Sequence, residues 1–303
     1  MILGGLSYLA IALMAPVALV AAPLAALLGV QRPTGRDAAT AVALAALVVV
    51  LCAGPADSFD QLERAWLILL TASLAVVLVS GRAGGFVTSA LAAVGCAGGA
   101  AVVLAALTRL SWGKLIWLAE RHYGLQLSWL VGQIAQAPGG SDLTTPLLGS
   151  LTLGVRIVSA LFPGLVLLQS FAALALAWAL YHRVAQRPQG EPLGALAAFR
   201  FNDHLIWGVA GSLLVLVFPR LGWVNALGGN LLVFFSGLYV VRGVAVLAAA
   251  AAAGVIGGPI AIVAATFVTL FLMPIAALGA LALGLTDTLM DWRQRLARAV
   301  QKP

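Results

Sequence analysis

Residues 223–253 read WVNALGGNLLVFFSGLYVVRGVAVLAAAAAA, and this stretch decides the fold class. It is longer than the roughly 20 apolar residues that cross a bilayer as a helix. Lipid offers no hydrogen-bond partners to the backbone, so a segment that crosses it must satisfy its own hydrogen bonds, as a helix does. The stretch therefore predicts a transmembrane helix that carries Asn225, Asn230 and Arg242 at membrane depth.

The composition extends this prediction to the whole chain. Of 303 residues, 62% are hydrophobic and 9% are charged, against about 25% charged residues in globular proteins, and the mean hydropathy is +1.07. The apolar runs are unbroken, whereas membrane-spanning strands alternate polar and apolar residues over roughly ten positions. We expect an all-α, polytopic transmembrane bundle in the lipid bilayer of the cell membrane.

The net charge of +7 does not indicate nucleic acid binding. The chain contains no basic stripe or nucleic-acid motif. Lys and Arg that flank membrane spans account for the excess, because they favour the interface and the cytoplasmic side.

Hydropathy predicts about eight spans, within a range of seven to nine, in a single integral membrane domain. Residues 1–107 hold the N-terminal spans, 108–145 an interfacial segment, 146–286 the C-terminal spans and 287–303 a basic cytoplasmic tail. The expected spans are residues 2–30, 38–53, 65–79, 86–107, 147–181, 205–218, 223–253 and 257–283. The fifth of them is long enough to tilt, or to bend at Pro163 and Gly164.

The interfacial segment combines aromatic and charged residues. Aromatic rings favour the headgroup layer and long basic side chains extend beside them, so we expect an amphipathic helix along the membrane surface. Its characteristic residues are Trp112, Lys114, Trp117, Glu120, Arg121, His122, Tyr123 and Trp129. Arg156, near the entry to the next span, is interpreted as a helix-end charge that reaches the interface.

The basic residues give conflicting orientations. In an eight-span count, Arg183 and Arg187 lie on one side of the membrane and the basic tail on the other. Both groups should prefer the cytoplasm. One predicted span is therefore miscounted or consists of two half-segments, and residues 2–30, 205–218 and the region of Pro274 are the candidates.

The motifs do not indicate an enzyme. The chain has no HExxH or Cys/His metal-ligand spacing and no GxSxG motif. Asp287 and Asp291 are four residues apart and could hold Mg²⁺, as in the second half of the signature of CDP-alcohol phosphotransferases, but the first half is absent. We interpret Asp287 and Asp291 as helix-end charges that pair with Arg293 or Arg295, and we expect no catalytic residue, metal or cofactor.

Arg242 leaves three interpretations open. The span ends near Val241, or Arg242 is a buried cation paired with Asp287 or the Asn residues, or it contacts an anionic ligand. Ionisable residues inside spans are functional candidates by default, and interhelical Asn contacts contribute roughly 1 kcal/mol. Asn225, Asn230 and Arg242 are therefore the candidate ligand-binding residues.

Small residues predict close helix packing at two places. Gly95 and Gly99 form a GxxxG pair, and residues 248–253 are all Ala. Cys52 and Cys96 have no partner pattern, so we expect free thiols that act as small hydrophobic residues.

The C-terminal third resembles a known family. The similarity is carried by Val217-Phe218-Pro219, Asn225 to Asn230, Gly237-Leu238-Tyr239, Arg242-Gly243, Leu283-Gly284-Leu285-Thr286-Asp287 and Asp291-Trp292-Arg293. These segments resemble the YybS-like family of uncharacterised bacterial integral membrane proteins. That family is similar in predicted fold to the S components of energy-coupling-factor transporters and to MreD.

The resemblance implies two functional hypotheses. The first is a small-molecule-binding subunit of a transporter in the bacterial inner membrane, which needs an energising partner because the chain has no nucleotide-binding motif. The second is a non-transporting scaffold for cell-envelope or other membrane proteins, which docks them on the small-residue faces. A closed polar cavity favours the first hypothesis, and an exposed small-residue groove favours the second.

Overall fold

A computed structural model describes residues 17–30, 34–53, 57–80, 85–136, 140–217, 222–254 and 273–295. Every regular element in these ranges is a helix, which confirms the all-α class. The elements are α2 (Val17–Val30), α3 (Gly35–Cys52), α4 (Ser58–Val79), α5 (Phe86–Leu107), α6 (Trp112–Gln136), α7 (Gly140–Ala160), α8 (Phe162–Val184), η1 (Leu196–Ala198), η2 (Asp203–Leu205), α9 (Ile206–Val217), α10 (Gly222–Ala252) and α12 (Met273–Met290).

Five of the described helices are long and apolar enough to cross a membrane. They are α3, α4, α5, α8 and residues 224–252 of α10. The predicted spans 2–30 and 257–283 lie partly outside the described residues. The helical-bundle prediction is therefore confirmed, and the count of eight spans stays a prediction.

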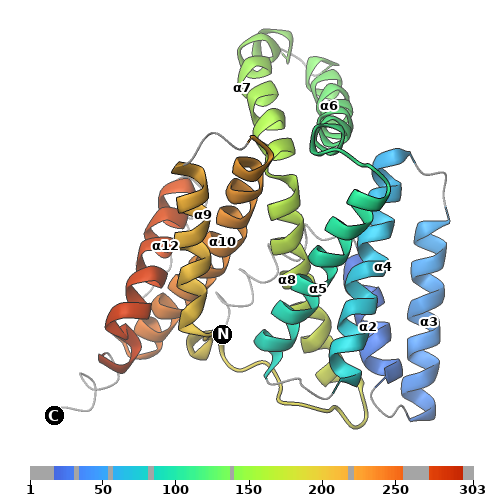
Figure 1. The fold of residues 1–303 in the computed structure, drawn as a ribbon, viewed down its shortest axis with the longest axis vertical. Helices are drawn as coiled ribbons and strands as arrows, with labels where there is room; N and C mark the ends of the chain where they lie inside the picture. Colours follow the sequence, from blue (N-terminus) through green and yellow to red (C-terminus); the bar gives the residue numbers. More distant parts are fainter. Residues whose placement is uncertain are drawn as a thin grey trace.

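The predicted span 147–181 is two helices. α7 ends at Ala160 and α8 begins at Phe162, with Pro163 in its first turn. Pro lacks the N–H that would continue a helix but is well tolerated at a helix start. α7 packs against α6, and Figure 1 shows both at one end of the bundle.

The apolar core is built around α8. Ala173 and Ala177 are fully buried on it, and it packs against α2, α5 and α10. Small side chains on one face let the neighbouring helices approach closely. Leu27 and Leu28 of α2 and Ala93 and Ala97 of α5 complete this core.

α10 and α12 cross almost in backbone contact. A Cβ on Gly243 would lie 1.8 Å from the carbonyl oxygen of Ala280, and one on Gly284 would lie 2.0 Å from that of Tyr239. Neither position has room for a larger side chain. The crossing therefore depends on glycine at both helices.

Residues 185–205, here called the end linker, connect α8 to α9 along the end opposite α6 (Figure 1). The backbone N–H groups of Gln186 and Gln189 donate to Asp37 Oδ1 at 3.2 Å and to the Tyr181 hydroxyl at 2.9 Å. Trp178 Nε1 donates to the carbonyl of Glu191 at 3.0 Å. The linker is thus fixed to the start of α3 and to the end of α8.

The eight-span count separates the two basic groups, whereas the described residues bring the start of the tail next to the end linker. Arg293, after α12, donates to the carbonyl of Phe199 in the end linker at 2.7 Å. The start of the tail therefore lies at the same end as the linker that follows Arg183. Among the described helices between them, α9 has 12 residues and extends only about 18 Å against a hydrocarbon core of about 30 Å.

Candidate functional site

A buried group of charged side chains joins α10, α12 and the end linker. Arg242 is 2% exposed. Its Nε donates to Asp287 Oδ2 at 2.9 Å, and its Nη1 donates to Asp203 Oδ1 at 2.6 Å. Its guanidinium also lies 5.3 Å from the ring centroid of Phe201, within cation–π range. We call Arg242, Asp287, Arg293 and Asp203 the ionic cluster.

The end of α12 brings Arg293 back to Asp287. The backbone of Asp291 has φ of 47° and donates to the carbonyl of Asp287 at 3.0 Å. This left-handed cap stops the helix and turns the chain. Arg293 Nη2 then donates to Asp287 Oδ2 at 2.7 Å, so the same carboxylate oxygen accepts from two guanidinium groups.

The cluster carries two positive and two negative charges. A buried ion is costly unless it is paired and hydrogen-bonded. Asp287 is 1% exposed, whereas the Asp203 side chain is 66% exposed. The cluster therefore reaches from the helix crossing to the surface of the bundle and holds the second half of the end linker in place.

The structure discriminates between the interpretations of Arg242. α10 continues to Ala252, well past Val241, and Arg242 is paired with Asp287 as the second interpretation predicts. Asp287 and Asp291 do not act as a pair: Asp287 faces Arg242 and Arg293, and Asp291 forms a surface ion pair with Arg200. This separation speaks against a shared Mg²⁺ ion.

Asn230 joins α10 to the break between α7 and α8. Its Oδ1 accepts from the Gly164 N–H at 2.7 Å, and its Nδ2 donates to the carbonyls of Ala160 at 3.0 Å and Ala226 at 2.8 Å. The amide thus satisfies backbone groups that the helix break leaves open. A Cβ on Gly164 would lie 2.4 Å from the carbonyl oxygen of Asn230, so the contact is direct.

The three candidate ligand-binding residues do not converge. Asn230 and Arg242 are separated by about 18 Å along the axis of α10, and Asn225 lies more than a turn beyond Asn230. Arg156 is exposed on α7 and lines an open hollow of about 440 Å³ with Gly149, Thr152 and Leu153. The sequence identified these polar residues, but α10 alone does not gather them into one pocket.

The GxxxG pair on α5 faces outward. Gly95 and Gly99 are exposed, and no described atom beyond their own helix lies within 4 Å of where a Cβ of either would be. The face of α5 that packs on the core contains Ala90, Ala93 and Ala97 instead. The prediction that the glycine pair packs against a neighbouring helix is therefore not met within the described part of the chain.

We define the outer face of α5 as its exposed positions at helical spacing. They carry small or aliphatic side chains and no charge: Thr88, Ala92, Gly95, Gly99, Val102, Val103 and Ala106. The second small-residue stretch differs, because Ala250 is buried whereas Ala251 and Ala252 are exposed. The outer face of α5 is thus an uncharged surface of small and aliphatic side chains.

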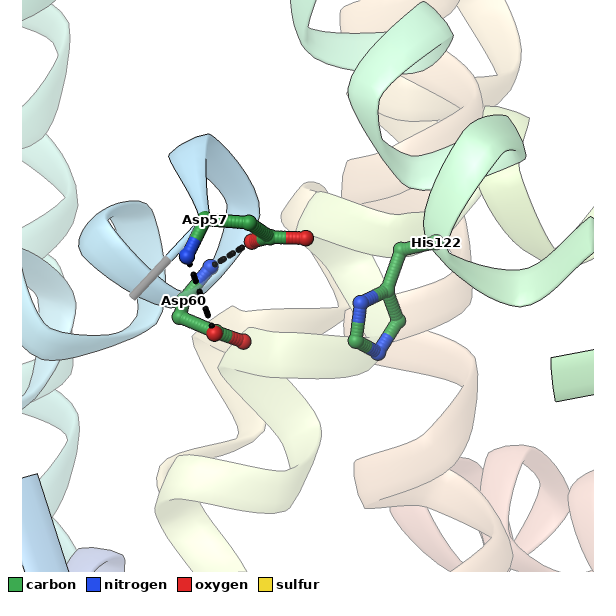
Figure 2. A group of neighbouring side chains, drawn as sticks. All are labelled: Asp57, Asp60 and His122. Atoms are coloured by element: carbon green, nitrogen blue, oxygen red, sulfur yellow. Dashed lines mark hydrogen bonds between the residues drawn. The ribbon is translucent and has the colours of Figure 1, made fainter. Parts of the chain in front are cut away.

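Sequence reasoning missed Asp203 of the ionic cluster, Arg200 beside it and a second polar group. Asp203 and Arg200 lie in the end linker, whose helices η1 and η2 have three residues each, so periodicity gives no prediction of a partner. Asp57, Asp60 and His122 lie together at the opposite end of the molecule (Figure 2). Their separation in the sequence hid this group, and it is the place among the described residues where three metal-ligating side chains meet.

The family described as "Predicted membrane protein (DUF2232)" matches residues 1–288. No curated protein and no solved structure matches the chain. The matched region includes Asp203, Arg242 and Asp287 and ends before Asp291 and Arg293.

Proposed function

The chain belongs to the DUF2232 family of predicted membrane proteins, and from this premise we propose that it is a non-enzymatic membrane scaffold. In this proposal the outer face of α5 binds a transmembrane helix of a partner protein. The partner is a cell-envelope or other integral membrane protein, by analogy with MreD, to which the YybS-like family is similar in predicted fold.

The observation that carries the proposal is the exposed pair Gly95 and Gly99. Helices associate in lipid through close backbone approach at small residues, because the hydrophobic effect does not drive association there. The α10–α12 crossing uses Gly243 and Gly284 in this way. Gly95 and Gly99 offer the same geometry without an occupant from the described chain.

The polar residues support a scaffold more than a transport subunit. The side chains of Asn230 and Arg242 are bonded to other parts of the chain. A small-molecule site needs polar groups that converge on a shared space. In the scaffold proposal, the ionic cluster instead fixes the last two helices and the end linker into one rigid unit.

A second candidate is a small-molecule-binding subunit that resembles an energy-coupling-factor S component. The hollow beside Arg156 favours it, because an exposed cation there could hold an anionic group. The lining residues that the structure describes all come from α7, so the described part of the hollow is a flank of one helix. We rank this function second for that reason.

Basic residues gather at the end of the bundle that carries the end linker, and they support an orientation for the scaffold. Arg36, Arg183, Arg187, Arg200 and Arg293 all lie in or beside the end linker or in segments bonded to it. The positive-inside rule assigns such an end to the cytoplasm. We place the C-terminal tail on the cytoplasmic side accordingly.

Native mass spectrometry of protein gently extracted from its own membrane tests the proposed function. We expect a co-purifying membrane protein that is lost in the variant Gly95→Leu/Gly99→Leu and retained in the matched variant Ala46→Leu, at an exposed position of α3. A bound small molecule that disappears in Arg156→Ala, with no protein partner, would favour the second candidate. A bare chain in every variant would contradict both functions.

A further inference from the structure

We propose that Asp57, Asp60 and His122 form a binding site for a divalent transition-metal ion such as Zn²⁺, which clamps the interfacial helix α6 to the start of α4. One ligand atom from each of the three residues lies within 4.8 Å of the others. The two carboxylates come from the N-terminus of α4 and the imidazole from α6. The site therefore joins two elements that are distant in the sequence.

The carboxylates keep one oxygen each for a metal. Asp57 Oδ1 accepts from the N–H groups of Phe59 and Asp60, both at 2.8 Å, and Asp60 Oδ2 accepts from the Asp57 N–H at 3.2 Å. These capping bonds hold both side chains in place and leave the second oxygen of each. Figure 2 shows the second oxygen of Asp57 directed toward the His122 ring.

The imidazole of His122 is held by two neighbours. Its ring stacks on Phe59 with centroids 4.2 Å apart and an interplanar angle of 20°. Its Nε2 lies 2.9 Å from the side-chain amide nitrogen of Gln126, so Nδ1 is the nitrogen left for a metal. Figure 2 shows a ring nitrogen on the side that faces the carboxylates.

Gln126 lies next to the ring nitrogen of His122 that would not bind the metal. A metal-bound His donates its other N–H to an acceptor, which fixes the tautomer and the ring orientation. A half-turn of the Gln126 amide places its carbonyl oxygen opposite Nε2 as that acceptor. Amide rotation of this kind needs no backbone movement.

Charge and ligand type indicate the kind of ion. Two carboxylates neutralise a divalent cation, and Asp57 and Asp60 supply them here. One His and two carboxylates with open positions suit Zn²⁺ and related ions. Ligand atoms in a tetrahedral zinc site are roughly 3.3 Å apart, so binding requires α4 and α6 to draw slightly closer from the 4.8 Å limit of the present arrangement.

The ion has a structural task here. Phe59, Leu118 and Ala119 form only a small apolar cluster between α4 and α6. A metal bridge adds binding energy to the folded arrangement alone and so stabilises it. The clamp would set the position of α6 against the bundle.

The test uses the full chain in detergent micelles, prepared without a polyhistidine tag and stripped of metal with a chelator. The stripped protein is then titrated with ZnCl₂ in competition with a chromophoric chelator. We expect one Zn²⁺ per chain and a zinc-dependent rise in Tm. Both should be lost in His122→Ala and in Asp57→Asn, which keeps a good N-cap residue. Gln126→Ala should weaken binding about tenfold.

The control is His204→Ala, which removes an exposed histidine at the opposite end of the molecule and should leave zinc binding unchanged. Absence of zinc binding by the wild-type chain overturns the proposal. Equal affinity in His122→Ala and the wild type overturns it as well, because the ion would then bind elsewhere.

Discussion

The α10–α12 crossing and the outer face of α5 use the same residue type with opposite outcomes. At the crossing, Gly243 and Gly284 each face a backbone carbonyl of the other helix. On α5, Gly95 and Gly99 face no described atom beyond their own helix. The difference shows that small-residue spacing predicts the capacity for close approach, and that the rest of the helix face decides whether the partner is internal.

The two regions also differ in their charged residues. The crossing lies beside the ionic cluster, which supplies directional bonds between α10 and α12. The outer face of α5 has no charged residue to fix a partner within the chain. Variants in the two regions should therefore separate internal stability from assembly.

The largest expected effect is that of Gly243→Ala. Its added methyl group meets the carbonyl oxygen of Ala280 and forces the helices apart, which should destabilise the fold by more than about 3 kcal/mol. Thermal unfolding in detergent measures the effect. Gly99→Ala is the matched control and should change stability by less than about 0.5 kcal/mol; equal effects of the two variants would remove the distinction between the regions.

The second largest loss of stability should be that of Arg242→Ala. We expect the free energy of unfolding to fall by about 3 kcal/mol, because Asp287 stays buried with one cation fewer. The midpoint of thermal unfolding should fall by several degrees. Arg200→Ala removes an ion pair whose side chains are 48% and 39% exposed, and such pairs contribute less than about 1 kcal/mol. An unchanged midpoint in Arg242→Ala would show that the cluster does not hold the crossing.

Asn230→Ala should destabilise the fold by about 1–3 kcal/mol, because the N–H of Gly164 then lacks its buried acceptor. The same midpoint measurement applies. Proteolysis at the junction of α7 and α8 should also become faster, since the break there loses its bonds to α10. If Asn230→Ala has the same stability and the same rate of proteolysis as the wild type, water replaces the amide without a loss of free energy.

The smallest effect on the isolated chain should come from Gly95→Leu/Gly99→Leu. Both added side chains enter open space, so stability should stay within about 0.5 kcal/mol of the wild type. Size-exclusion chromatography of native-membrane extracts should nevertheless show a smaller complex. A strongly lowered midpoint would place these glycines at an internal contact.

Much of the architecture follows from the sequence. Unbroken apolar runs predict helices because lipid offers no partner to backbone groups, and α5 has the predicted bounds, 86–107. Pro163 and Gly164 marked a possible bend in the span 147–181, but the division into two helices at Leu161 was less predictable, because the apolar character continues through it. Hydropathy measures transfer to lipid and does not measure helix continuity.

The partners of the charged residues were harder to predict. Periodicity on α10 places Arg242 on a helix face, but Asp203 lies in a linker without periodicity. Asp287 was one of several acceptors open to Arg242, and the left-handed turn at Asp291 that returns Arg293 to it has no marker such as glycine. Charge pairing across 45 residues depends on how two helices cross, which a single sequence does not specify.

The most direct test of the account is photocrosslinking from Cys96, an exposed thiol next to Gly95. A Cys52→Ser chain labelled with benzophenone maleimide in its native membrane should give a discrete adduct with one membrane protein. The adduct should disappear when Gly95 and Gly99 are replaced by Leu, while Tm is unchanged. Labelling of Cys96 without any protein adduct would contradict the claim that the outer face of α5 binds a partner.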